Sequence, residues 1–319
     1  MSRITFLDNA SGGKNNWWRY LSTIILTWGG GKIFAIMLPI FMSAVFYLML
    51  NGFNSSSQIN SVISNPLFIL LKIGIGEIIL FLIFYICIRF IHKRKLISLV
   101  NTRSTISWSR ILKGAVIWFT ILVLVGILSL MSPHSGAKVT FNPNSFIILL
   151  ILSLIIFPIQ ASFEELFFRG YLMQGLGLLT KKPVIPLLIT SIVFAIPHYF
   201  NIYYINGAST LIGIDWAIQA FIIGIALGII VLGENRLETA IGVHTINNLF
   251  GTVVIYDTST GLFGNLPAII TVTSQGTPNI IGGALMSVLF LLVLLTVVFW
   301  NKWEKMYNIF KTERNDTLF

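Results

Sequence analysis

The sequence predicts an all-α integral membrane protein with about eight transmembrane helices and with its N and C termini in the cytoplasm. Hydrophobic residues make up 55% of the 319 residues and charged residues only 10%, whereas soluble domains hold about 25% charged residues. The mean hydropathy is +0.87. Several apolar runs reach the roughly 20 residues that a helix needs to cross the hydrocarbon layer of a bilayer.

Eight apolar segments account for the predicted spans, and Gly and Pro residues punctuate the loops between them. They are residues 33–52, 67–91, 111–131, 146–165, 184–203, 216–232, 239–256 and 279–300. We therefore divide the chain into three parts. These are a cytoplasmic or interfacial segment at 1–32, a polytopic membrane domain at 33–300, and a cytoplasmic tail at 301–319.

Positive charges gather in alternate loops, which predicts the orientation of the spans. The basic loop residues are Arg89, Lys93, Arg94, Lys95, Arg103, Arg110, Lys113, Lys181, Lys182, Arg236 and those of the tail from Lys302, whereas the intervening loops hold only Lys138. The positive-inside rule places every basic loop in the cytoplasm. The net charge of +10 is therefore explained by lipid headgroups, and we expect no nucleic-acid partner.

The fourth apolar run is too long for one span. Residues 146–179 are nearly continuously apolar, and as a straight helix they would extend about 50 Å, well beyond the hydrocarbon thickness. Gly170 follows an acidic pair and Arg169. We expect the spanning part to end near Arg169, and residues 171–180 to lie along the cytoplasmic interface.

Two adjacent carboxylates lie inside this fourth span, where charged groups are costly. Glu164 and Glu165 occur in the segment ASFEELFFRG, and Arg169 follows Glu165 by four residues. This spacing places Glu165 and Arg169 on one helix face, so we expect Arg169 to neutralise Glu165. Glu164 lies about 100° around the helix, where it can face a cavity and act as a general base on water. The alternative is a purely structural Glu–Arg pair.

Two histidines also lie in predicted spans. His198 ends the stretch SIVFAIPH, with Phe194 four residues earlier on the same face. His244 opens HTINN, which places Asn248 one turn further on and Asn247 three residues away. Each histidine considered alone is equally explained by a hydrogen bond between helices.

Together with Glu164, these side chains fit amide hydrolysis by activated water. That chemistry needs a carboxylate base, an imidazole that shares the proton, and imidazole and carboxamide donors. His198 would hold or activate the water. His244 and Asn248 would form the oxyanion hole, with Asn247 as a second candidate amide.

The motifs EELFFRG, FAIPH and HTINN, in this order, resemble those of the CPBP (CAAX protease and bacteriocin-processing) family of intramembrane glutamic endopeptidases. The resemblance covers roughly residues 146–252, the core of the membrane domain. It implies an eight-span protease in which Glu164 is the base and His244 with Asn248 stabilises the oxyanion. It also implies membrane-associated peptide substrates, which are prenylated for eukaryotic members, and bacterial relatives are linked to bacteriocin immunity.

Three other interpretations stay open. A zinc ion could be bound by Glu164 or Glu165 with His198 and His244, although the histidine spacing gives no support for it and the family resemblance implies no cofactor. The single cysteine, Cys87, excludes a multi-cysteine metal site. The second interpretation is a non-catalytic protein of the same fold that binds a peptide, confers immunity or scaffolds a partner. The third is a proton-coupled transporter, because buried Glu and His side chains also form proton relays.

Two further features of the spans bear on the site. On the second span, we favour structural roles for Lys72, which can reach toward the outer headgroups, and for Glu77, which can hydrogen-bond a neighbouring helix; the alternative is that Glu77 joins the cavity. Counted from the cytoplasmic ends of their helices, His198 lies about 21 Å deep and His244 about 12 Å. Straight helices would not bring the two imidazoles together.

The family pattern favours a multi-pass protein of the plasma membrane of a prokaryotic cell. Membrane lipids and a membrane-associated or lipid-modified peptide are its expected partners.

Overall fold

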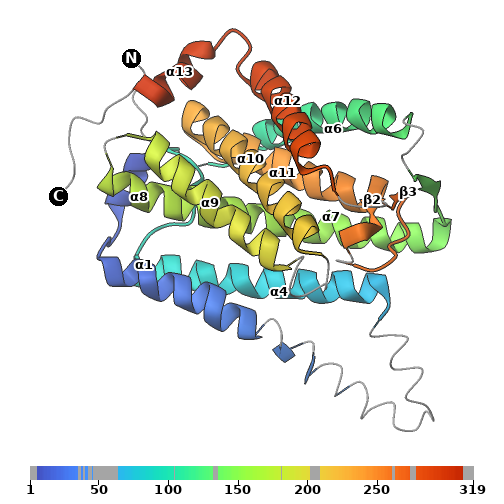
Figure 1. Cartoon of the computed structure of the whole chain (residues 1–319). Helices are drawn as coiled ribbons and strands as arrows, with labels where there is room; N and C mark the ends of the chain where they lie inside the picture. Colours follow the sequence, from blue (N-terminus) through green and yellow to red (C-terminus); the bar gives the residue numbers. More distant parts are fainter. Residues whose placement is uncertain are drawn as a thin grey trace.

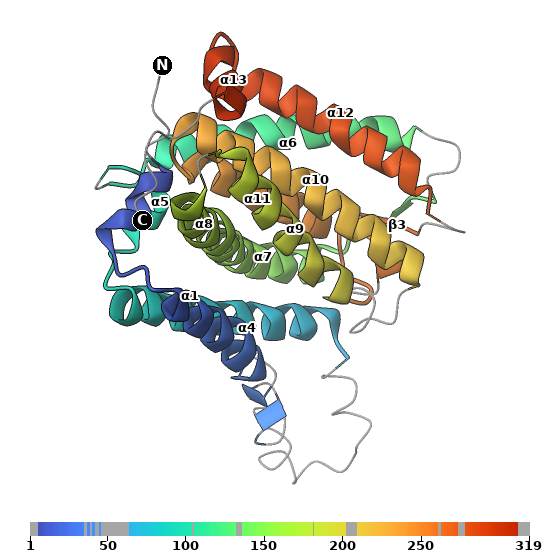
Figure 2. The same ribbon diagram turned by 60° about the vertical axis from the view of Figure 1, so that its left-hand side comes forward.

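In the computed structural model, the chain folds as a bundle of helices with a small sheet at one end (Figures 1 and 2). The structure describes residues 6–34, 37–38, 40–41, 45, 64–103, 105–131, 136–180, 182–201, 209–260, 263–273 and 278–311.

The first membrane helix begins earlier than expected. After the 3-10 helix η1 (Leu7–Gly12), helix α1 (Trp17–Ile24) continues into the π-helical segment η2 (Ile25–Gly30), so the predicted start at residue 33 lies inside a helical stretch. Thr23 and Thr27 interrupt the apolar run, but both are fully buried. Their polarity therefore faces protein instead of lipid, which an apolar-run criterion cannot detect. Most of residues 42–52 of this span lie outside the described residues.

The second and third spans match their predicted bounds closely. Helix α4 (Pro66–Ile86) continues into the π-helical segment η3 (Cys87–Ile91), and the short helix α5 (Ile97–Val100) leads to α6 (Trp108–Leu130). At the start of α4, the Asn65 side chain accepts a hydrogen bond from the Leu67 N–H. An Asn cap followed by Pro at the first helical position is a strong start signal.

The long fourth run is one continuous helix of 37 residues. It comprises α7 (Pro143–Glu165), the π-helical segment η4 (Leu166–Leu172) and α8 (Met173–Leu179). The helix therefore does not break near Arg169, and the level at which its membrane-spanning part ends stays a prediction. Gly170 permits close packing instead of a break, because a Cβ there would lie 2.9 Å from the Leu99 carbonyl oxygen. Helix α8 packs against η1 and is largely buried.

The C-terminal half supplies the remaining helices. They are α9 (Val184–Phe200), α10 (Thr210–Glu234), α11 (Glu238–Leu249) with the π-helical segment η6 (Phe250–Val254), α12 (Ile280–Val298) and α13 (Trp303–Lys311). Among the described residues, five helices are long and apolar enough to cross a membrane, whereas the apolar helix α9 is shorter. The chain is thus a helical, multi-pass membrane protein, and the count of eight spans stays a prediction.

The two ends of the described chain lie at the same end of the bundle. Figure 1 shows η1, α8 and α13 on its left-hand side, away from the small sheet. The loop between η3 and α6, which holds Lys93, Arg94, Lys95 and Arg103, begins at this end as well. This arrangement fits termini on one side of the membrane, and the cytoplasmic orientation stays a prediction.

A three-stranded sheet, which the all-α prediction did not include, lies at the other end (Figure 1). Strand β3 (Ile270–Val272) is central, antiparallel to β1 (Lys138–Val139) and parallel to β2 (Ile255–Asp257). Strands of two or three residues are too short to produce an alternating pattern in the sequence. Because β2 follows η6 directly, the seventh predicted span turns into a strand at Ile255.

Helix α11 occupies the centre of the bundle because glycines allow α6 to approach it. A Cβ at Gly242 would lie 2.0 Å from the Ile111 carbonyl oxygen, and a Cβ at Gly114 would lie 2.2 Å from that of Thr239. Small residues at such crossings let backbones pack closely in membrane helices. This packing places the HTINN motif beside the end of α7.

Candidate active site

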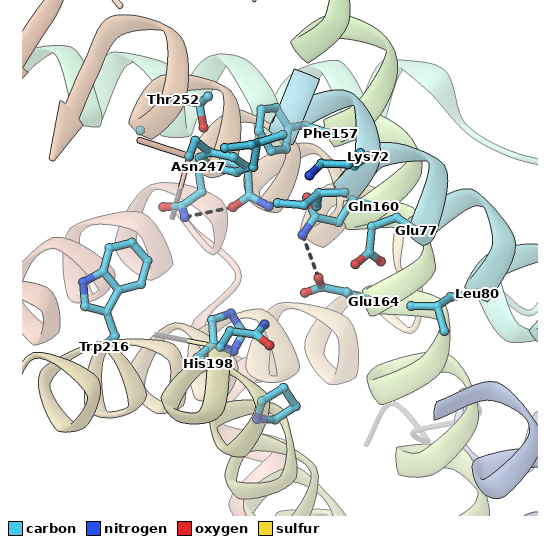
Figure 3. A pocket seen from close by; sticks show the side chains of 18 of the residues that line it. Lys72, Glu77, Leu80, Phe157, Gln160, Glu164, His198, Trp216, Asn247 and Thr252 are labelled. Atoms are coloured by element: carbon cyan, nitrogen blue, oxygen red, sulfur yellow. Dashed lines mark hydrogen bonds between the residues drawn. The ribbon is translucent and has the colours of Figure 1, made fainter. Parts of the chain in front are cut away.

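A cavity of about 710 Å³ lies among α4, α7, α9, α11 and η6 (Figure 3). Trp28 and Lys32 of the first helical stretch, Trp216 of α10 and the residues of strand β2 also line it. Its polar side chains include Lys72, Glu77, Gln160, Glu164, His198, Asn247, Asn248 and Thr252. The cavity is therefore mostly apolar with a few polar groups, as ligand sites usually are.

Glu165 and Arg169 form a buried ion pair, as their spacing predicts. Arg169 Nη1 donates to Glu165 Oε1 at 2.6 Å, and both side chains are at most 1% exposed. The guanidinium also donates from Nη2 to the Gly224 carbonyl at 3.3 Å and lies over the Phe194 ring at 4.3 Å. Glu165 does not line the cavity, so it acts on the site only through its neighbours.

His244 lies between the two adjacent carboxylates. Its Nδ1 is 2.8 Å from Glu165 Oε1, and its Nε2 is 3.6 Å from Glu164 Oε2. A carboxylate paired with Arg169 can only accept, so Nδ1 carries a proton and donates it to Glu165. The second separation exceeds a hydrogen bond. Glu165 thereby orients the imidazole while Nε2 points toward Glu164.

Glu164 is the acidic residue of the motif that faces the cavity (Figure 3). Its side chain is 12% exposed. Gln160, one turn earlier on α7, donates from Nε2 to Glu164 Oε1 at 3.1 Å. The two oxygens of Glu164 therefore face different partners, Gln160 on one side and His244 on the other.

His198 lines the same cavity from α9. Its Nδ1 is 2.9 Å from the Phe194 carbonyl oxygen, and because a carbonyl only accepts, Nδ1 carries the proton. In the neutral ring Nε2 is then an acceptor, which suits a group that holds water. The Phe194 ring contacts the imidazoles of both His198 and His244, with centroid distances of 4.7 and 5.8 Å.

The sequence left the depth of His198 open, because distortion beside Pro197, helix tilt or an unwound start near Pro186 could each bring the two imidazoles together. Depth counted along one helix does not set the level at which that helix starts, and tilt changes it further. Tertiary packing around the Phe194 ring brings His198 and His244 to one place.

Asn247 and Asn248 both line the cavity, but they are held differently. Asn247 Oδ1 accepts from Trp118 Nε1 at 3.2 Å, and its Nδ2 approaches Asn248 Oδ1 at 3.4 Å. The Trp118 contact fixes the orientation of the Asn247 amide. The Asn248 Nδ2 donor has no hydrogen bond to other described residues.

Comparisons with known proteins identify the family of this chain. A sequence profile of the family described as type II CAAX prenyl endopeptidase Rce1-like matches residues 143–250. A protein of Bacillus subtilis (strain 168), named uncharacterized protein YyaK, is 30% identical over 272 residues, which cover 83% of this chain and 86% of that protein. The chain belongs to the CAAX protease (CPBP) family. No solved structure matches it.

The CAAX protease profile spans α7 to the start of η6 and so contains all eight site residues that the sequence indicated. The structure gathers them around one cavity wall, with Glu164, His198, Asn247 and Asn248 lining it. Phe194 also lines it, whereas Glu165, Arg169 and His244 lie behind that wall. The first helical stretch and α4, which complete the cavity, lie outside the matched region.

The zinc alternative finds no ready-made site in this CPBP protein. Within the part of the chain that the structure describes, no group of three or more His, Cys, Asp or Glu side chains is arranged to hold a metal ion. Arg169 lies within the same buried network as Glu165 and His244. A cation there is a poor neighbour for a divalent metal. That the protein needs no zinc stays a prediction.

Three polar residues of the cavity were missed or interpreted differently from sequence. Lys72 and Glu77 line it instead of serving only the exterior of the bundle, and Lys72 Nζ lies 5.4 Å from the Phe68 ring. Gln160 was not singled out at all. Its position four residues before Glu164 is the signal that could have found it, because residues at that spacing share a helix face.

Proposed function

We propose that this chain is an intramembrane endopeptidase that hydrolyses peptide bonds of membrane-associated peptides with a water activated by Glu164. The observation that carries the proposal is the division between the adjacent carboxylates. Glu165 is fully buried and bound to Arg169 and His244, whereas Glu164 faces the cavity. One carboxylate thus organises the site and the other meets the substrate.

In the proposed reaction, Glu164 removes a proton from a water molecule, and the water oxygen attacks the carbonyl carbon of the scissile bond. The carbon–nitrogen bond of the tetrahedral intermediate then breaks. Glu164 passes the proton to the leaving amine. His198 supports the water, because its Nε2 is an acceptor in the neutral ring and the ring lines the same cavity.

The oxyanion that forms on the former carbonyl oxygen needs donors. Asn248 lines the cavity and offers Nδ2, and Asn247 is held beside it by Trp118. His244 donates a hydrogen bond from Nδ1 to Glu165, and its Nε2 donates to the oxyanion when a second proton makes the ring an imidazolium. A carboxylate at Nδ1 stabilises that charged form, as in the triads of serine proteases.

The cavity suits a substrate that is largely apolar. Its wall combines Trp28, Phe157 and Trp216 with the polar groups named above. We propose a hydrophobic, amphipathic or lipid-modified peptide, prenylated or of bacteriocin type, that reaches the site from the membrane. The plasma membrane of a prokaryotic cell is the proposed location.

The test is cleavage of membrane-tethered and isoprenylated peptides by purified protein in detergent. Wild type, Glu164→Gln and His244→Ala are compared, with and without a chelator. We expect Glu164→Gln to lower kcat at least 100-fold, because general-base catalysis contributes about 10²–10⁴-fold. Activity in Glu164→Gln equal to that of wild type would exclude the proposed base.

The same experiment separates the rival interpretations. Loss of activity on chelation that added zinc restores would favour a metal mechanism. Peptide binding without cleavage, unchanged in Glu164→Gln, would favour a non-catalytic binding or immunity protein. A matched control is Ser153→Ala, which removes a buried hydroxyl without a hydrogen-bond partner from the same helix.

A further inference from the structure

Gln160 holds the one side-chain hydrogen bond that Glu164 makes to a described residue. The two residues are four positions apart on α7 and both line the cavity (Figure 3). Only the Nε2 end of the amide can donate to a carboxylate, so the orientation of the amide is settled when Glu164 is ionised. This leaves Gln160 Oε1 buried without a hydrogen-bond partner.

An unsatisfied buried carbonyl costs about 1–3 kcal/mol in ordinary cores, so it calls for a reason. A reason exists if Glu164 changes its protonation state during the reaction. A protonated Glu164 has an O–H to donate, and a half-turn of the Gln160 amide presents Oε1 as the acceptor. Glutamine therefore matches both forms of the carboxyl group, which neither lysine nor leucine at this position would do.

The hydrogen bond from Gln160 also determines which carboxylate oxygen of Glu164 is left to contact a water molecule. Oε1 is occupied by Gln160, while Oε2 faces His244 Nε2 at 3.6 Å. That gap is too long for a direct hydrogen bond but leaves Oε2 to a water molecule. Without Gln160, the carboxylate could rotate and lose this direction.

We propose that Gln160 is a positioning residue for Glu164, fixing the direction of its carboxylate and supporting both of its protonation states. The proposal rests on the proposed function of Glu164 as the base. It adds a residue that none of the three sequence motifs contains.

Other charged groups around Glu164 also affect the pH dependence of the reaction. Glu77 on α4 and Arg169 on η4 interact with it electrostatically, and His198 on α9 and His244 on α11 face it across the site. Lys32 interacts with Glu77 in turn. All of these groups are unchanged in variants of Gln160, so a shift between variants reports the change at Gln160.

The experiment compares wild type, Gln160→Met and Gln160→Glu in detergent by two readouts. The first is the pH dependence of kcat and KM for peptide cleavage. The second is infrared titration of the carboxyl band that disappears in Glu164→Gln, which needs no activity. Gln174→Glu is the matched control, because it adds the same charge to the same continuous helix next to Arg94, remote from Glu164.

In Gln160→Met we expect kcat to fall about tenfold with little change in KM, because a bond to a charged group is lost. The titration midpoint of the Glu164 band and the acidic limb of the kcat profile should both move up, because the bond from Gln160 to the ionised carboxylate is stronger than the bond to the protonated form. In Gln160→Glu they should move further, because two adjacent carboxyl groups disfavour ionisation of the pair. Gln174→Glu should leave both unchanged.

The outcomes separate this inference from the function on which it rests. If Gln160→Met cleaved peptide with the same kcat as wild type and its Glu164 band were unchanged, the positioning role would be overturned, and the proposed protease function would still stand. A shifted band in a protein that cleaves no peptide would support the positioning role and reject the protease. A purely space-filling role predicts wild-type kcat and an unchanged band for Gln160→Met, which has a similar volume, whereas Gln160→Glu shifts the band under either role because it adds a carboxyl group beside Glu164.

Discussion

Breaking the buried Glu165–Arg169 pair from one side should destabilise the protein more than removing the pair completely. Glu165→Leu leaves the guanidinium of Arg169, which is 1% exposed, without its carboxylate. Removing one partner of such a pair costs about 3–5 kcal/mol, because an uncompensated charge stays buried. The double variant Glu165→Leu/Arg169→Met buries no charge. It loses the bond to the Gly224 carbonyl and the stacking on Phe194, together worth about 1–2 kcal/mol.

The assay is thermal unfolding in detergent, followed by tryptophan fluorescence. We expect the unfolding temperature of Glu165→Leu to fall by about 10 °C, and that of the double variant to recover most of the loss. Peptide cleavage should not recover, because His244 Nδ1 lacks its acceptor in both variants. If the double variant were no more stable than Glu165→Leu, the reasoning about the uncompensated charge would be refuted.

Three further predictions concern other contacts. Trp118→Phe removes the N–H that orients Asn247, and we expect a loss of about 1 kcal/mol in the free energy of unfolding and lower kcat. Gly242→Ala places a methyl group 2.0 Å from a backbone oxygen of α6. We therefore expect the free energy of unfolding, measured by thermal unfolding, to fall by about 1–3 kcal/mol or more. Burial lowers the pKa of His92 from 6.5. The free energy of unfolding should therefore be highest above about pH 6.5 and should fall as the pH drops below that value. In His92→Gln this fall should be smaller.

Each of these predictions has a control or a contradicting result. The control for Gly242→Ala is Gly30→Ala, which introduces a methyl group where nothing lies within 4 Å. If Gly30→Ala lost as much free energy of unfolding as Gly242→Ala, the loss would not be due to close packing. An unfolding temperature that is independent of pH between 5 and 7 would contradict the His92 prediction. For Trp118→Phe, unchanged kcat and stability would mean that Asn247 needs no support.

Local chemistry made part of the site predictable. The four-residue spacing of Glu165 and Arg169 is a property of any α-helix, so the ion pair followed from the sequence. The placement of Phe194 beside His198 followed in the same way. The role of Glu165 as the partner of His244 did not, because that contact joins α7 to α11 and depends on how the two helices cross.

Elements that depend on their neighbours were the ones that sequence patterns missed. The helical stretch that starts at Trp17 was missed because Thr23 and Thr27 are polar although they are buried, and hydropathy alone cannot distinguish such residues from exposed ones. Likewise, Gly170 lies where we expected the spanning part to end, and in the structure it allows close packing against α5 within a continuous helix. A glycine permits both outcomes, and only the neighbouring backbone selects one.

The sequence by itself determined that this chain is a helical membrane protein of the CAAX protease family, because apolar runs and ordered motifs are properties of the chain. It also determined which acidic pair and which histidines were candidates for the chemistry. The helical spacing already predicted that Glu164, and not Glu165, can face a cavity, and only the tertiary structure showed which helices enclose that cavity. It alone placed Gln160, Glu77 and Lys72 at that cavity. Such choices depend on contacts between helices distant in sequence, which no local spacing encodes.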